Sequence, residues 1–297
     1  MNTIVNQLRY QYPFSVSTDN AGLFGNPRSA ITFWENVTAT VAGHPVQFGL
    51  ELLAWRHLPM RAVLNLPEVR ARLAGCHGRI GTRIESHGSA FDQAVLKKKI
   101  WLYNNVLHPS VSLLQAMTTT TEDWSQKPYL LMHEPEIELL LQNDALAHAP
   151  RAIPIGVENN IDDPNLSLTR GAVSKLQSMG FEAVPVFDLA HFLTCHDSLM
   201  TPAKTWDKML AQFSEQMMVH IPIGFNVSDS LHFEHTTDSM LRELAAAVRE
   251  SESYCTLEFQ LAGIWPLYAQ PTYLPYVTQY ASDWLGRLLA AEVISAR

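Results

Sequence analysis

Eight short apolar runs alternate with segments of helical spacing along the whole chain. One run contains Val184 and Val186 in a stretch that is apolar on both faces, which is typical of parallel strands covered by helices. Between the runs, apolar residues recur at steps of three and four, as at Leu241, Leu244 and Val248, which is the spacing of a helix that buries one face. The runs lie at 14–18, 46–55, 79–87, 128–134, 152–158, 183–188, 217–223 and 254–259. The alternation predicts an α/β fold, a closed (β/α)8 TIM barrel, because the sequence lacks the glycine-rich first turn of an open doubly wound sheet.

We expect one domain to span the chain. Its 297 residues suffice for one large α/β domain, and 47% hydrophobic with 17% charged residues is an ordinary balance for a chain that buries a sizeable core. The sequence contains no linker, low-complexity tract or charge block that would mark an internal boundary. The prediction is therefore a single TIM-barrel domain over residues 1–297.

Charge, hydropathy and cysteine content restrict the partners and the compartment. The formal net charge is −8 and the one basic run is Lys97–Lys99, so a nucleic-acid partner is not expected. No stretch approaches the roughly 18 apolar residues that cross a membrane, and the polar N-terminus does not resemble a secretory signal. The three cysteines form no close pair, and no motif indicates a nucleotide cofactor. We therefore expect a cytoplasmic protein with a small-molecule substrate, and the sequence is compatible with a homo-oligomer.

Histidines and carboxylates end most of the predicted strands. The C-terminal ends of barrel strands surround one site, so residues distant in sequence converge there. A carboxylate buried at such an end is costly unless it is paired, and a divalent cation would offset that cost. Oxygen and imidazole ligands together suit manganese, cobalt, zinc or iron. In the alternative, neighbouring groups satisfy each of these residues as a structural polar group, but consecutive strands that all end this way weaken that alternative. The residues concerned are His87, His133, Glu158, Asp188, His191, His220 and Glu258.

Four short motifs carry a resemblance to a known family. Val-Glu158-Asn, Phe-Asp188-Leu-Ala-His191, Val-His220 and Leu-Glu258 resemble the motifs of the xylose-isomerase-like TIM-barrel superfamily, from about the second strand to the last. That superfamily contains sugar isomerases and epimerases and the class II apurinic endonucleases. The resemblance implies that Glu158, Asp188, His220 and Glu258 bind a shared divalent metal. It also implies that Glu158 and Glu258 are the catalytic carboxylates, and that His191 binds a second metal or the substrate.

The endonuclease branch of the superfamily implies further ligands. His87 and His133 lie where that branch has two zinc histidines, and Asp229 with His232 lies where it has an Asp-x-His pair after the seventh strand. Here that pair is one residue wider, with His235 as another candidate. His133-Glu134-Pro135 also replaces the glycine-containing histidine motif of that branch. These departures count against a full three-zinc site.

The sugar-enzyme branch is matched incompletely as well. Asn160 stands where a xylose isomerase has a lysine, and residues 220–241 contain neither lysine nor arginine, whereas ketose 3-epimerases place an arginine there. Glu51, Glu85 and Trp55 are candidate substrate-binding residues on the second and third predicted strands. The alternative for the two glutamates is a satisfied polar group, and for the tryptophan a place in the core.

Three hypotheses for function follow. The first is a divalent-metal-dependent isomerase or epimerase of a sugar or 2-oxo compound, in which a carboxylate moves a proton beside a metal-polarised carbonyl. The second is a multi-metal hydrolase or oxidative enzyme that resembles the apurinic endonucleases, which cleave phosphodiesters. The third is a barrel without activity that serves as a partner-binding subunit. The number of metal-ligand residue types at strand ends places the third last.

Overall fold

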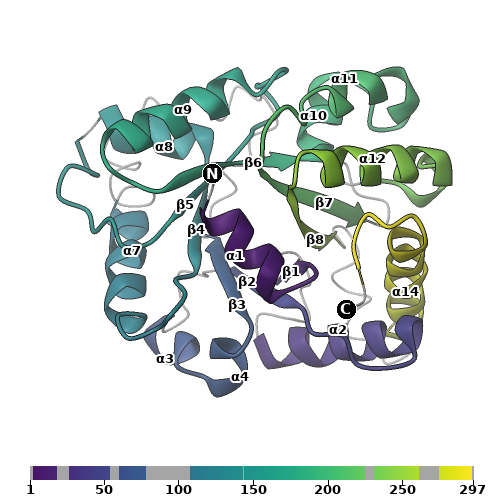
Figure 1. Ribbon diagram of the computed structural model, residues 1–297, viewed down its shortest axis with the longest axis horizontal. Helices are drawn as coiled ribbons and strands as arrows, with labels where there is room; N and C mark the ends of the chain where they lie inside the picture. Colours follow the sequence, from purple (N-terminus) through teal and green to yellow (C-terminus); the bar gives the residue numbers. More distant parts are fainter. Residues whose placement is uncertain are drawn as a thin grey trace.

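A computed structural model shows eight parallel strands that close into one barrel in sequence order (Figure 1). The structure describes residues 3–18, 27–53, 60–77, 108–142, 144–224, 231–260 and 274–295. The predicted (β/α)8 TIM-barrel fold is confirmed. The strands are β1 (Ser15–Ser17), β2 (Gly49–Leu53), β3 (Leu73–His77), β4 (Tyr129–His133), β5 (Ile155–Glu158), β6 (Ala183–Asp188), β7 (Met218–Gly224) and β8 (Tyr254–Gln260).

Helices surround the barrel in chain order. They are α1 (Thr3–Gln11), α2 (Pro27–Ala42), α3 (Met60–Leu64), α4 (Pro67–Arg70), α7 (His108–Thr120), α8 (Glu134–Gln142), α9 (Ser167–Ser178), α10 (Leu189–Cys195), α11 (Trp206–Leu210), α12 (Asp238–Glu250) and α14 (Leu274–Ala290). Short 3-10 turns η2 and η3 lie at Pro202–Lys204 and Phe233–His235. No described helix combines the length and the apolar composition that crossing a membrane requires.

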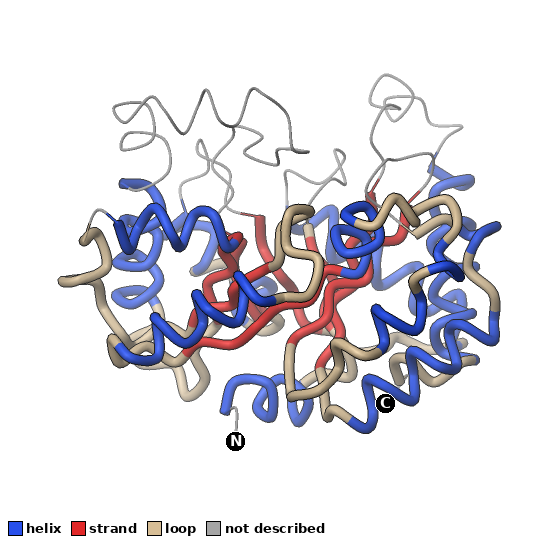
Figure 2. The backbone as a smooth tube through the Cα atoms, turned by 90° about the horizontal axis from the view of Figure 1, so that it is seen from above, coloured by secondary structure: helices blue, strands red, loops and turns tan. Residues whose placement is uncertain are grey.

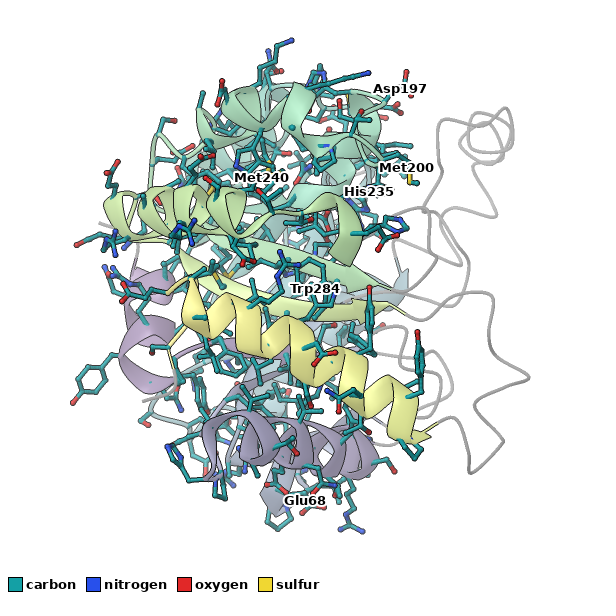
Figure 3. The ribbon with its side chains drawn as sticks, turned by 90° about the vertical axis from the view of Figure 1, so that its right-hand side faces the viewer. Glu68, Asp197, Met200, His235, Met240 and Trp284 are labelled. Carbon is teal, nitrogen blue, oxygen red and sulfur yellow. The ribbon has the colours of Figure 1, made fainter. Side chains whose placement is uncertain are left out.

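The outer helices pack as their sequence spacing predicts. In α12, Leu241, Leu244 and Val248 are all buried, and the Thr237 hydroxyl caps the helix by accepting from the backbone N–H of Met240. Met240 of α12 and Trp284 of α14 are both buried in the layer between the helices and the barrel, and both are labelled in Figure 3. Burial of these apolar faces holds α12 and α14 against the barrel.

The third strand is Leu73–His77, so the prediction of a third strand at 79–87 is wrong. Leu73-Ala-Gly-Cys-His77 is short and contains a glycine, so its apolar pattern in the sequence is weak. Its partners define it as a strand, because Cys76 pairs with Leu52 of β2 and Leu130 of β4. The residue that ends the third strand is therefore His77 rather than His87, and residues 79–87 lie outside the described part of the chain.

The N-terminal helix α1 lies across one end of the barrel, below the strands in Figure 2. The N–H of Ile4 donates to Glu182 just before β6, and Gln216 just before β7 donates to Asn6. Ile4, Val5, Leu8 and Tyr12 join inward-facing strand residues in an apolar cluster of their own, which includes Tyr129 and Tyr254. This end holds the amino ends of the strands, so the carboxyl ends open at the opposite end of the barrel.

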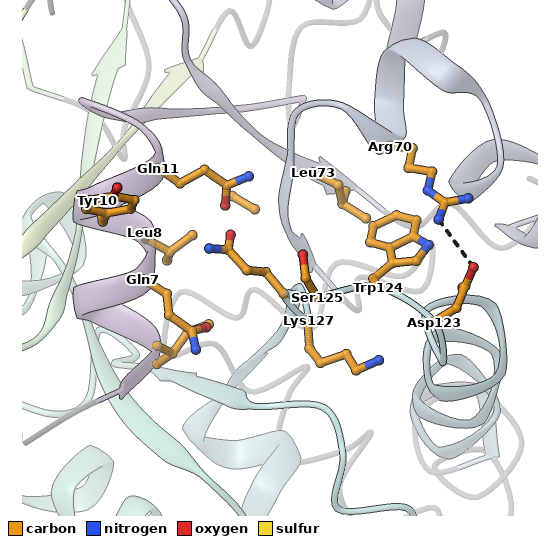
Figure 4. Close-up of a pocket in the computed structure, with 13 residues that line it drawn as sticks. Gln7, Leu8, Tyr10, Gln11, Arg70, Leu73, Asp123, Trp124, Ser125 and Lys127 are labelled. Atoms are coloured by element: carbon orange, nitrogen blue, oxygen red, sulfur yellow. Dashed lines mark ion pairs between the residues drawn. The ribbon is translucent and has the colours of Figure 1, made fainter.

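A cavity of about 600 Å³ lies at the α1 end of the barrel (Figure 4). Gln7 and Gln11 of α1 line one side, and the segment before β4 lines the other, where Arg70 stacks on Trp124 and pairs with Asp123 at 3.5 Å. A second cavity of about 770 Å³ lies beside the amino ends of β6 and β7. Both are remote from the carboxyl ends of the strands, where (β/α)8 enzymes carry their active sites.

Gly75 of β3 leaves the space that the ring of Tyr129 occupies, so the fold depends on its missing side chain. A Cβ atom at this position would overlap that buried ring. We expect Gly75→Ala to lower the free energy of unfolding by roughly 1–3 kcal/mol through overpacking. The measurement is urea unfolding followed by circular dichroism.

Gly171→Ala is the matched control. Gly171 lies on the exposed side of α9 with nothing within 4 Å of the added Cβ. This change should stabilise the protein by up to about 1 kcal/mol, because alanine favours the helix. Equal stability of the Gly75→Ala variant and the wild type would contradict the packing described for Tyr129.

Candidate metal centre

Consecutive strands place acidic and histidine side chains at the open end of the barrel. His133, Glu158 and Asp188 are the last residues of β4, β5 and β6. The register pairs His133 with Glu158 and Asp188 with His220 of β7, and Asp188 lies two residues beyond Val186, the partner of Glu158. Glu258 of β8 lies two residues beyond the position that pairs with His220. The closed sheet therefore brings together five residues that the sequence spreads over more than a hundred positions.

His220 lies at the centre of this arrangement. Its Nδ1 is 3.3 Å from Oε1 of Glu158 and 3.1 Å from Oε1 of Glu258. Its Nε2, on the other edge of the ring, is 3.2 Å from Oε2 of Glu51. The imidazole is completely buried, so all three contacts are formed away from water.

Glu51 of β2 lies deeper in the barrel than the strand ends. Its carboxylate is completely buried and accepts hydrogen bonds on Oε2 from the hydroxyl of Tyr129 and from His220. These contacts favour a role toward His220 over the predicted role in substrate binding. Burial is the main cause that raises the pKa of Tyr129 well above 10, and the negative charge of Glu51 adds to it. The phenol therefore stays protonated and acts as a hydrogen-bond donor to Glu51.

The pKa values of Glu158 and His220 are both raised in this site. Burial raises the pKa of Glu158 to about 7, although the neighbouring His220 opposes that rise. Burial alone would lower the pKa of His220, but the carboxylates of Glu51, Glu258 and Glu158 raise it well above its ordinary value. Both groups therefore hold a proton to higher pH than the same side chains do in water.

A second group of ligand atoms lies on the other side of Glu158. Nε2 of His133 is 3.4 Å from Oε2 of Glu158, and His191 lies next to His133, with 5.9 Å between the two ring centres. Nδ1 of His191 donates to the backbone oxygen of Asn159 at 2.8 Å. Because a carbonyl only accepts, Nδ1 carries the proton in the neutral ring, and Nε2 keeps the lone pair that a metal requires.

Asn159 holds the ends of β5 and β6 together. Its side-chain oxygen accepts from the N–H of Asp188 at 2.6 Å, and its amide donates to the backbone oxygen of Asp188 at 3.3 Å. Asp188 in turn caps α10, because Oδ1 accepts from the N–H of His191 at 2.7 Å. The Asp-x-x-His motif is therefore a helix start that fixes an aspartate and a histidine on adjacent sides of one site.

The donor set fits a divalent cation. Three groups each offer ligand atoms within 4.8 Å of one another; they are His133 with Glu158 and His191, Glu158 with Asp188 and His220, and Glu51 with His220 and Glu258. When Nε2 of His220 donates to Glu51, its Nδ1 faces the oxygens of Glu158 and Glu258 with a lone pair of its own. Such an arrangement of acceptors requires a proton or a cation between them, and imidazole with carboxylates suits manganese, cobalt, zinc or iron. The buried His, Glu and Asp groups could thus bind a metal.

Two of the other residues predicted for the site, His232 and His235, lie in the described part of the chain, and four do not. Trp55, Glu85, His87 and Asp229 lie outside the described residues. His232 lies before the turn η3 after β7, with Nδ1 3.7 Å from Oε1 of Glu234, and it belongs to none of the three groups found in the described part of the chain. His235, labelled in Figure 3, lies in the same turn.

Sequence reasoning missed Tyr129, Glu136 and the structural role of Asn159. Glu136 accepts from the N–H of His133 at 3.2 Å and so supports the end of β4. Tyr129 is the second residue of the fourth apolar run, where nothing in the local pattern separates an inward phenol from a core aromatic. The Glu158-Asn159 pair was the one available signal, because a buried asparagine at a strand end needs several hydrogen-bond partners.

No protein-family model matches the chain, and no curated protein matches it.

The raised pKa values predict that cation binding depends on pH. Glu158, with its pKa at about 7, and His220 must both lose a proton to act as ligands, so metal binding releases protons. As the pH falls below 7, we expect the affinity for Co²⁺ to fall about tenfold per pH unit for each proton released. Isothermal titration between pH 6 and 8, in buffers of different ionisation enthalpy, measures the affinity for Co²⁺ and the number of protons released. An affinity that stays constant over this range would contradict the assignment of these two residues as ligands.

Proposed function

We propose that the protein is a divalent-metal-dependent enzyme with two adjacent cation subsites at the open end of the barrel. The observation that carries the proposal is the position of Glu158 between two histidines. Its Oε1 is 3.3 Å from His220, and its Oε2 is 3.4 Å from His133. A carboxylate whose two oxygens face separate imidazoles can bind one cation with each oxygen.

In this proposal one subsite takes Glu158, Asp188, His220 and Glu258, and the other takes His133, Glu158 and His191. Each subsite combines carboxylate with imidazole, the donor set of manganese, cobalt, zinc or iron. Buried carboxylates need positive charge close by, and cations at the ligand atoms would supply it. A single-cation site would not require the imidazoles of both His133 and His191 beside Glu158.

The reaction that this arrangement favours is hydrolysis of a small polar compound. A cation pair held by these residues would supply a water nucleophile at neutral pH and would stabilise negative charge on the attacked group. The protein holds the ligands rigidly: Asn159 joins β5 to β6, and the Asp188 cap fixes His191. The net charge of −8 favours a small substrate over a nucleic acid.

A sugar or 2-oxo-compound isomerase or epimerase is the second candidate, and the pKa of Glu158 is the observation that favours it. A carboxyl group with a pKa of about 7 is well suited to take and return a proton near neutral pH. This reaction needs one cation, bound by Glu258, Asp188 and His220, which would leave Glu158 close to the substrate. In that case His133 and His191 would bind substrate hydroxyl groups.

Metal content separates the two candidates. Protein purified without chelator should carry or take up about two equivalents of manganese, zinc or iron, as measured by plasma mass spectrometry. One equivalent would support the isomerase in place of the two-cation enzyme, and iron in both subsites would favour oxidative chemistry over hydrolysis. Protein that contains no metal and binds none on addition would overturn both candidates.

Two substitutions test the separate subsites. We expect His133→Asn to retain about one equivalent, because it removes a ligand of the second subsite alone, and Glu258→Gln to retain about one at the other subsite. The control is His148→Asn, because His148 is exposed and lies in the segment that leads from α8 to the amino end of β5. Wild-type metal content in both the His133→Asn and Glu258→Gln variants would show that the cations bind elsewhere.

A further inference from the structure

We propose that Glu51 and Tyr129 are positioning residues that keep the proton of His220 on Nε2, so that His220 binds its cation through Nδ1. The inference rests on the proposed metal site and deepens it. It concerns which of the two ring nitrogens of His220 binds the cation, a choice that the identity of the ligands does not settle. It also gives a function to a buried carboxylate that the proposed mechanism does not use.

The contacts of Glu51 run toward His220. Glu51 is the third residue of β2, Tyr129 is the first of β4 and His220 lies within β7, and all three side chains are completely buried. Oε2 of Glu51 accepts hydrogen bonds from the Tyr129 hydroxyl and, at 3.2 Å, from Nε2 of His220. One carboxylate oxygen thus joins a phenol from one side of the barrel to an imidazole from another.

This contact decides the tautomer of the imidazole. An ionised carboxylate oxygen only accepts hydrogen bonds, so the ring nitrogen that faces Glu51 must donate. A neutral imidazole has one N–H, and with that proton on Nε2 the lone pair lies on Nδ1. Nδ1 is the atom that faces Glu158 at 3.3 Å and Glu258 at 3.1 Å. Histidines that bind metals commonly donate their other ring N–H to a carboxylate, which orients the ring and raises its basicity.

Tyr129 orients the carboxylate itself. Its hydroxyl donates to the same oxygen that receives His220, and Gly75 leaves the space for its ring. Without this donor, Glu51 would lose one of the hydrogen bonds that hold its carboxylate plane toward His220. The competing explanation is a buried cluster in which Glu51 and Tyr129 serve stability alone and leave the cation affinity of His220 unchanged.

Co²⁺ binding to three variants of the full chain tests the proposal. Glu51→Gln keeps the shape but removes the charge that holds the proton, so the affinity for Co²⁺ should fall about 10- to 100-fold. Tyr129→Phe removes one hydrogen bond to Glu51, so the affinity should fall about 2- to 10-fold. In both variants the visible d–d bands of bound Co²⁺ should shift, because the basicity of the His220 ligand changes. Circular dichroism of the metal-free proteins checks that each variant folds.

Tyr254→Phe is the matched control. Tyr254 is also a buried barrel tyrosine of the same apolar cluster, but its hydroxyl lies 2.7 Å from Oγ of Ser15 rather than on Glu51. This variant loses a comparable buried hydrogen bond, and it should keep the Co²⁺ affinity and spectrum of the wild type. If Glu51→Gln does not fold, the comparison of Tyr129→Phe with Tyr254→Phe decides the question.

The outcomes distinguish this inference from the proposed function. Wild-type protein that binds no Co²⁺ would overturn the metal site and the inference together. Tight binding by the wild type, with unchanged affinity and spectrum in Glu51→Gln and Tyr129→Phe, would overturn only the positioning role. Equal losses in Tyr129→Phe and Tyr254→Phe would also overturn it, because they would indicate a general loosening of the barrel.

Discussion

The burial of His220 among carboxylates is the interaction on which the site depends. Three glutamates from β2, β5 and β8 surround one imidazole, at distances between 3.1 and 3.3 Å. Charges this close and this far from water are costly unless protons or cations lie between them. Of these strands only β8 pairs with β7, and β2 and β5 bring their glutamates to His220 inside the barrel because the sheet closes. The electrostatics of the site therefore depend on the closed barrel.

The two ends of the barrel have separate tasks. At the amino ends of the strands, α1 covers the barrel and buries Ile4, Val5 and Leu8 against inward-facing residues. At the carboxyl ends, histidines and carboxylates replace the apolar side chains, and Asn159 with the Asp188 cap supplies the rigidity that apolar packing supplies elsewhere. This division agrees with the general rule for (β/α)8 barrels, in which one face stabilises and the other carries chemistry.

The position of His133 and His191 beside Glu158 changes the order of the functional hypotheses. From the sequence, a one-cation isomerase ranks first, because four ligands suffice for it and the chain is acidic. The structure brings His133 and His191 together with Glu158, a group that a one-cation site does not require. The order changes because adjacency in space, unlike the presence of a residue type, is a property of the folded chain.

The amino-acid sequence was enough to predict the fold class and to predict that Glu158, Asp188 and His220 converge. Apolar runs that alternate with helical spacing specify parallel strands under helices, and the ends of such strands meet. It placed the third strand wrongly, because Leu73–His77 owes its strand structure to β2 and β4 rather than to its own apolar pattern. The contacts of Glu51 with Tyr129 and His220 became visible in the folded chain alone. Inward positions in the middle of a strand contact residues across the barrel, and no local pattern records which ones.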